Sequence, residues 1–198
     1  MFKLFVTNIN SLSKKDIDAI SNERKAKALM YSFKNDQLLS YAAGVAFDKG
    51  LKTYNLYEKD VVIEYGNNGK PSLKDYPQIH FNISHSSELA IAAFSDSEIG
   101  CDIEQVRKLK ESVLNSCFTS EEISYVNNSE DKDFAFTEIW TLKESFLKCL
   151  GLGIAYKLNK FSVIKNGKIE LMQSINEKAY KFVQERIDNY LIAICKEL

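Results

Sequence analysis

The 198 residues contain 26 basic and 27 acidic side chains, which gives a net charge of -1 and a pI of about 6.2. The chain therefore lacks the overall positive field that binds nucleic acid or an anionic membrane, and any phosphate binding must come from local clusters. The hydrophobic fraction of 45% is sufficient for the core of one domain or of two small lobes.

The cysteines and the first residues indicate where the protein works. Four cysteines are scattered without Cys-x-x-Cys spacing, and only two histidines are present, so no zinc pattern exists. The first apolar run is too short for a signal peptide, and no stretch approaches the roughly 18 apolar residues of a membrane-spanning helix. We expect a cytoplasmic protein with reduced thiols.

In chain order, residues 1–8 are predicted to form a strand, and Ser11 or Ser13 is predicted to cap a charged helix. An apolar pattern typical of helices then extends from 21 to 46, with a break near 34–36. Arg24 and Lys27 lie one turn apart at the start of this region. Their spacing alone indicates a basic helix face that is exposed to solvent.

A short run of β-branched residues at 61–64 leads into a glycine-rich and asparagine-rich turn at 65–71. Residues 79–83 and 89–94 are predicted to be strands, joined by a serine-rich connection that contains His85. These features are also typical of a hairpin loop and of a solvent-exposed histidine that have no functional role.

Two pairs of charged side chains stand out in the second half. At 99–104 apolar residues alternate with polar ones, so Asp102 and Glu104 share one face of a predicted strand. In the predicted helix at 134–150, Glu144 and Lys148 lie one turn apart and away from the apolar stripe. Three carboxylates brought together suit a hard cation such as Mg²⁺. Taken singly, however, each pair is typical of a solvated face or a surface ion pair.

The remaining elements complete the second half. A turn at 95–98 marks the expected boundary between lobes, and Gly151 and Gly153 are predicted to end the long helix. Helices are predicted at 111–117 and from 120, and strands at 157–163, 168–172 and 190–195, the first two joined by a hairpin at Asn166 and Gly167.

Five motifs in this order resemble the 4′-phosphopantetheinyl transferases, most closely the longer, monomeric type that activates nonribosomal peptide synthetases. The motifs are Gly69–Pro71, Phe81–Ser86, Gly100–Glu104, Phe118–Glu122 and Trp140–Lys148. The resemblance implies an α+β fold of two similar lobes, a pseudo-dimer with the active site between them. We expect the lobes at 1–97, with contacts to coenzyme A, and at 98–198, with the metal site and the catalytic helix.

The resemblance also implies a role for each matching residue. Mg²⁺, or Mn²⁺ in its place, is expected on Asp102, Glu104 and Glu144. The expected catalytic residues are Glu144, Lys148 and, as a secondary candidate, Glu122. The residues expected to bind coenzyme A are Arg24, Lys27, Ser40, Lys70, Pro71, Ser84, His85 and Lys143, with the basic pair Arg24 and Lys27 on the 3′-phosphate. One position departs from the family: Leu39 precedes Ser40 where an arginine is frequent.

The implied reaction moves the phosphopantetheine arm of coenzyme A to a serine of an apo acyl or peptidyl carrier protein and releases 3′,5′-ADP. A monomer that binds neither nucleic acid nor membrane is expected. Two alternatives stay open: a Mg²⁺-dependent phosphohydrolase that uses water, and a noncatalytic module that binds coenzyme A or a carrier protein. The presence of both Asp-x-Glu and Lys-Glu-x-x-x-Lys argues against the module, because binding alone does not need both pairs.

Overall fold

A computed structural model describes residues 1–153 and 155–198 of the chain. The α-helices of these residues are α1 (Lys14–Ala19), α2 (Asn22–Leu29), α3 (Lys34–Lys52), α4 (Glu111–Cys117), α5 (Ser120–Asn128) and α6 (Lys132–Leu150). The strands are β1 (Phe2–Asn8), β2 (Ile63–Tyr65), β3 (Pro71–Leu73), β4 (His80–Ser86), β5 (Leu89–Ser95), β6 (Ile99–Gln105), β7 (Ser162–Asn166), β8 (Lys168–Met172), β9 (Tyr180–Ile187) and β10 (Tyr190–Glu197).

The order of elements repeats along the chain. Each half begins with a strand, continues through three helices and a small hairpin, and ends with two long antiparallel strands. The long strands form two sheets of the same order, β1-β5-β4 and β6-β10-β9, in which the last strand of each half lies in the middle. The predicted α+β fold of two similar lobes is confirmed, although the repeat is invisible in the residues themselves. The division at residue 97 stays a prediction.

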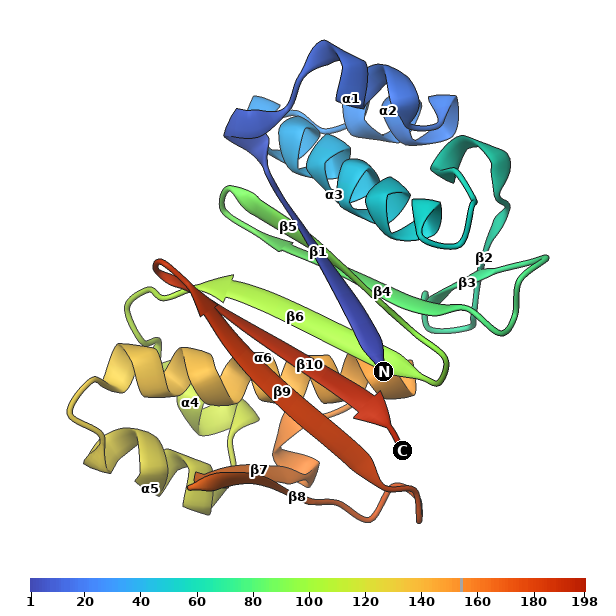
Figure 1. The fold of residues 1–198 in the computed structure, drawn as a ribbon. Coiled ribbons are helices and arrows are strands. Elements are labelled where there is room, and N and C mark those ends of the chain that lie inside the picture. The colour runs from blue at the N-terminus through green and yellow to red at the C-terminus, as the bar shows by residue number, and fades with distance from the viewer. Residues whose placement is uncertain (154) are drawn as a thin grey trace.

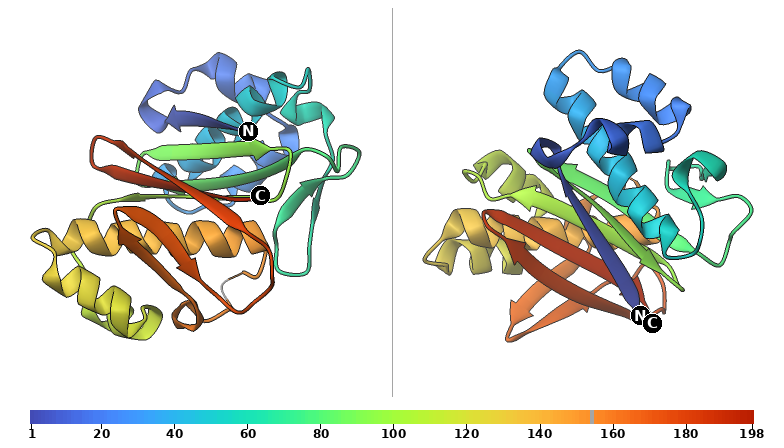
Figure 2. Two further views of the ribbon diagram at one scale, coloured as in Figure 1. Left: turned by 60° about the horizontal axis from the view of Figure 1, so that its bottom comes forward. Right: turned by 45° about the horizontal axis from the view of Figure 1, so that its top comes forward.

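The two sheets face each other, and each carries one long helix on its outer face (Figures 1 and 2). Between the sheets lies an apolar cluster formed by alternate residues of β5, β6 and β10, including Ile91, Ile103 and Ile192. The opposite residues of β5 pack against α3, and those of β10 pack against α6. Both central strands are therefore covered on both faces, which explains why every residue of β5 is buried.

Local sequence signals set the helix ends. Ser13 and Asp16 form a capping box at the start of α1, and Thr119 and Glu122 form another at the start of α5. Gly151, at φ = 68°, ends α6 in the left-handed conformation that glycine adopts without strain. The helix break predicted near 34–36 lies earlier, between Leu29 and Lys34.

Two strand predictions were wrong in part, and one strand was not predicted. The strand predicted at 79–83 extends through Ser86, so His85 lies on β4 and not in the connection to β5. In the segment 157–163, residues Leu158–Lys160 form a 3-10 turn and the strand begins at Ser162. Strand β9 was not predicted. It is an edge strand that pairs only with β10, and its exposed charged residues obscure the alternation of apolar and polar side chains. No helix in the described part of the chain is both long enough and apolar enough to cross a bilayer.

Strand β6 and helix α6 pack closely at Gly100. A Cβ atom on Gly100 would lie 2.1 Å from the carbonyl oxygen of Ser145 and 2.2 Å from the amide nitrogen of Cys149. Because both contacts are with backbone, only glycine lets β6 approach α6 this far. This approach brings Asp102, two residues along the strand, to the helix that carries Glu144 and Lys148.

We expect Gly100→Ala to separate β6 from α6 and to lower the free energy of unfolding by about 1–3 kcal/mol, the usual cost of overpacking. Urea denaturation followed by circular dichroism measures this. Gly66→Ala is the matched control, because its Cβ would meet nothing closer than the carbonyl oxygen of Lys70 at 3.7 Å. Equal stability of the two variants would show that the close contact at Gly100 is relieved at no cost.

Candidate functional site

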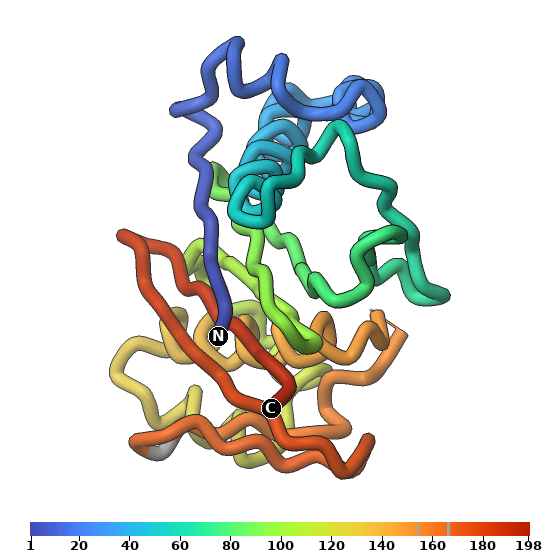
Figure 3. The backbone as a smooth tube through the Cα atoms, turned by 45° about the vertical axis from the view of Figure 1, so that its right-hand side comes forward, coloured from blue at the N-terminus to red at the C-terminus, as the bar shows by residue number. Residues whose placement is uncertain are grey.

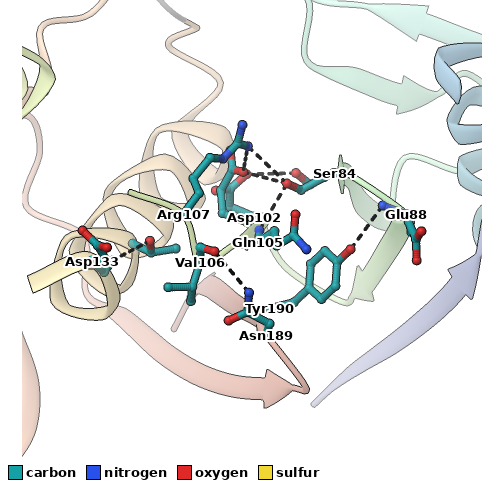
Figure 4. A network of polar contacts seen from close by, with 12 residues as sticks. Ser84, Glu88, Asp102, Gln105, Val106, Arg107, Asp133, Asn189 and Tyr190 are labelled. Carbon is teal, nitrogen blue, oxygen red and sulfur yellow. Dashed lines mark hydrogen bonds and ion pairs between the residues drawn. The ribbon is translucent and has the colours of Figure 1, made fainter. Parts of the chain in front are cut away.

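Asp102 lies where β4, β6 and α6 meet. Its side chain is almost fully buried, and its Oδ1 atom accepts hydrogen bonds from Ser84 Oγ at 2.9 Å and from Lys148 Nζ at 2.6 Å (Figure 4 shows Ser84 beside Asp102). Lys148 Nζ also donates to Ser84 Oγ at 3.0 Å. The other carboxylate oxygen, Oδ2, is buried and has no hydrogen-bond partner among the described residues. An unpartnered buried carboxylate oxygen is costly, so this atom is available for a ligand.

The charges around Asp102 influence one another. Burial raises the pKa of Asp102, although Lys148 opposes the shift. Burial and the charge of Asp102 raise the pKa of Glu144, and Glu104 adds to the effect. Burial alone would lower the pKa of Lys148, but Asp102 outweighs it and raises that pKa. The three carboxylates therefore act as one anionic group that gains from a bound cation.

Glu104 occupies the same face of β6 as Asp102, as predicted, and is held by two residues that were not among the predicted site residues. Ser86 Oγ donates to Glu104 Oε2 at 2.7 Å, and Arg107 Nη2 donates to the same atom at 2.8 Å. The signal for Ser86 was the alternation of polar residues at Asn82, Ser84 and Ser86, which is typical of a strand with one polar face.

The donor chemistry at this place fits a hard divalent cation. Asp102 Oδ2 is buried and unpartnered, and the neighbouring groups are carboxylates, the ligands that Mg²⁺ and Mn²⁺ prefer. Within residues 1–153 and 155–198, however, no three His, Cys, Asp or Glu side chains are already arranged to hold a metal. In this arrangement the Lys148 ammonium group neutralises Asp102. The assignment of Asp102, Glu104 and Glu144 as metal ligands stays a prediction.

His85 is exposed on β4, between Ser84 and Ser86. Partial burial lowers the pKa of His85, and the positive charge of Lys148 lowers it further. At neutral pH the imidazole is therefore uncharged, and it offers a hydrogen-bond donor rather than a positive charge.

We expect His85 to titrate below 6.5 in an NMR pH series, with the signal assigned by its loss in His85→Gln. A lowered pKa means that the unfolded chain binds the proton more readily. The contribution of His85 to stability should thus be present at neutral pH and decline as the pH falls through 6.5 towards the lowered value. A titration midpoint at or above 6.5 would contradict this.

The turn between β2 and β3 reaches the end of α6 (Figure 3). Lys70 Nζ donates to the carbonyl oxygen of Cys149 at 2.5 Å and pairs with Glu98. Asn68 Nδ2 donates to the carbonyl oxygen of Gly151 at 3.0 Å. Lys70 is thus held at the C-terminal end of α6, and its ammonium group is occupied by protein partners. Pro71 begins β3, opposite Tyr65.

A pocket of mixed charge lies in the first lobe, where Asp18, Glu23 and Glu58 line it beside four basic residues. Arg24 and Lys27 line this pocket of about 530 Å³ between α2 and β2, together with Lys25 and Lys59. The Arg24 side chain packs over Gly44 of α3, and its Nε atom donates to Glu58 at 2.7 Å.

Two neighbouring positions of α3 are both buried. Ser40 is buried in α3, and so is the departing residue Leu39, which packs in the core against Ile9 and Ala43. The side chain of Leu39 therefore belongs to the core.

The structure brings Glu122 and Lys143 together, but with each other and not with the Asp102 group. Lys143 Nζ donates to both carboxylate oxygens of Glu122, at 2.6 and 2.7 Å, and both side chains are fully buried. Glu122 also accepts hydrogen bonds from the amides of Thr119 and Val163. Their predicted roles, Glu122 near the reacting groups and Lys143 towards coenzyme A, stay predictions.

Known proteins are similar to this chain in sequence. Residues 98–195 match the model of the 4′-phosphopantetheinyl transferase superfamily. The 4′-phosphopantetheinyl transferase Sfp of Bacillus subtilis is 30% identical over 183 residues, which cover 89% of this chain and 81% of that protein. The 4′-phosphopantetheinyl transferase psf-1 of Bacillus pumilus is 29% identical over 72% of this chain, and the aligned region spans 63% of its length.

Among solved structures, a holo-(acyl-carrier-protein) synthase from Bacillus anthracis in complex with CoA matches with a TM-score of 0.46 and 17% identity. The match covers 51% of this chain and 95% of that one.

Proposed function

Because the chain belongs to the 4′-phosphopantetheinyl transferases, a superfamily of enzymes, we propose that it transfers the phosphopantetheine arm of coenzyme A to a carrier protein. The acceptor is a serine of an apo acyl or peptidyl carrier protein, and 3′,5′-ADP is released. One observation carries the proposal: the buried Asp102, with one oxygen held by Ser84 and Lys148 and the other unpartnered, lies beside Glu144 on α6.

The acid–base step belongs to Glu144. Its carboxylate takes the proton of the carrier serine hydroxyl as that oxygen attacks the phosphorus that bears the pantetheine arm. The bond from this phosphorus to the bridging oxygen then breaks, and the Lys148 ammonium group stabilises the negative charge on the departing 3′,5′-ADP.

A Mg²⁺ or Mn²⁺ ion held by Asp102, Glu104 and Glu144 would neutralise the charge of the pyrophosphate when bound. Lys70 and His85 donate hydrogen bonds to the same phosphates. Lys70 leaves its ion pair with Glu98 to do so.

Arg24 and Lys27 attract the 3′-phosphate to the pocket in the first lobe. Further contacts of coenzyme A with Ser40, Pro71 and Ser84 complete the proposal, whereas Lys143 is fully buried in its ion pair with Glu122. A single copy of the chain supplies all of these residues, and we place the reaction in the cytoplasm.

The test is the intact mass of an apo carrier protein after incubation with this protein, coenzyme A and Mg²⁺. We expect a gain of one phosphopantetheine arm, its loss with EDTA, and its return with added Mn²⁺. A carrier whose acceptor serine is replaced by alanine is the control. Cleavage of coenzyme A without any mass gain, on acyl and peptidyl carriers alike, would favour the phosphohydrolase. Neither cleavage nor gain would favour the noncatalytic binding module.

A further inference from the structure

Polar side chains of β4 join the first sheet to β6 of the second sheet. They are spaced two residues apart, so they lie on one face of β4 and meet successive parts of β6. Asn82, Ser84 and Ser86 contact Cys101, Asp102 and Glu104 respectively. Each of these three β4 residues is buried.

Ser86 uses its hydroxyl group fully. Its Oγ donates to Glu104 Oε2 at 2.7 Å and accepts from the amide of Gln105 at 3.2 Å, and Arg107 Nη2 approaches it at 3.5 Å. The serine thus holds both the backbone that follows Glu104 and the carboxylate itself. Because Ser86 contacts both the Gln105 amide and the Glu104 carboxylate, it fixes the orientation of the Glu104 side chain relative to the backbone of β6.

Asp102 and Glu104 are held in the same way. In each carboxylate, one oxygen accepts from a serine of β4 and from a cationic side chain: Lys148 for Asp102 and Arg107 for Glu104. Asp102 Oδ2 has no partner, and no described residue donates a hydrogen bond to Glu104 Oε1. Each carboxylate therefore keeps one oxygen for a ligand.

The two residues on Glu104 Oε2 are not equivalent. Ser86 is only 5% exposed, so its hydroxyl group is fixed by its surroundings. The Arg107 side chain is 65% exposed, and an ion pair of this kind contributes little because solvent screens it. We propose that Ser86 is a positioning residue that holds Glu104 Oε2 and so presents Oε1 to the divalent cation. This inference rests on the proposed function and adds Ser86 to the residues on which metal binding depends.

The test measures metal binding directly. The affinity of the full chain for Mn²⁺, in the presence of coenzyme A, is obtained from the electron paramagnetic resonance signal of free Mn²⁺. We expect Ser86→Ala to weaken binding about tenfold, as loss of an outer hydrogen bond to a metal ligand usually does. Ser86→Thr, which keeps the hydroxyl group, should restore most of the affinity. Ser116→Ala, at an exposed serine of α4, is the matched control.

A double-mutant cycle shows whether Ser86 acts through Glu104. In a Glu104→Gln background, Ser86→Ala should change Mn²⁺ affinity less than about twofold, because the group it positions is altered already. The same tenfold loss in both backgrounds would overturn the inference. So would unchanged Mn²⁺ affinity in Ser86→Ala accompanied by a lower melting temperature, which would make Ser86 purely structural. Wild-type protein that binds no Mn²⁺ overturns it as well, and the carrier mass assay then decides separately whether the proposed transfer survives.

Discussion

Replacing Glu144 by glutamine should lower the rate of phosphopantetheine transfer by about 10³-fold while the fold is retained. Glutamine keeps the shape of the side chain but removes both the base and one of three clustered negative charges, and loss of a general base typically costs 10²–10⁴-fold. No described residue donates a hydrogen bond to the Glu144 carboxylate, so no internal contact is lost. Because Asp102 and Glu104 repel Glu144, the variant should be as stable as the wild type or slightly more stable.

Two measurements check this expectation: the rate of mass gain of an apo carrier protein, and the melting temperature of each variant. Glu121→Gln is the matched control, because it removes an exposed carboxylate at the start of α5. We expect it to keep full activity. Full transfer activity in Glu144→Gln, with normal circular dichroism, would remove Glu144 from the mechanism.

Lys143→Met should lower the free energy of unfolding by about 3–5 kcal/mol, the usual cost of leaving one partner of a buried ion pair alone. Lys143 Nζ has three acceptors, the two oxygens of Glu122 and the carbonyl oxygen of Phe161, each within 2.7 Å. Both ionic side chains are 0% exposed, so water cannot replace the lost partner. Burial lowers the pKa of Lys143, although the charge of Glu122 opposes that shift.

The double variant Glu122→Gln, Lys143→Met should recover part of this loss, because no buried charge remains and the amide oxygen still accepts from one of the two backbone amides, Thr119 or Val163, that donate to Glu122. Lys168→Met is the control for an exposed pair. Lys168 and Glu170 are 79% and 50% exposed, so its cost should stay below about 0.5 kcal/mol. A Lys143→Met protein of normal stability that no longer binds coenzyme A would instead support the predicted role of Lys143 as a coenzyme A ligand.

The sequence by itself determined the local structure, in which each residue depends only on others within one helical turn or a few positions of a strand. The alternation at 99–104 correctly placed Asp102 and Glu104 on one face of β6, and helical spacing placed Glu144 and Lys148 together on α6. Capping residues and a glycine determine the ends of α1, α5 and α6. These signals are local, so they can be recognised without knowledge of the fold.

Only the tertiary structure decided which partner each polar side chain meets. Ser86 and Glu104 are 18 residues apart, and Lys70 and Cys149 are 79 apart, yet each pair forms a hydrogen bond. The serine-rich end of β4 looks like a loop in the sequence because polar residues are usually solvated. It is a buried strand here because β6 supplies hydrogen-bond partners that compensate for the lost water. In the same way, Glu122 and Lys143 are candidate site residues in the sequence, and the packing of α5 against α6 makes them a buried ion pair. The reason is physical: the cost of burying a polar group depends on its partner, and the fold alone brings distant partners together.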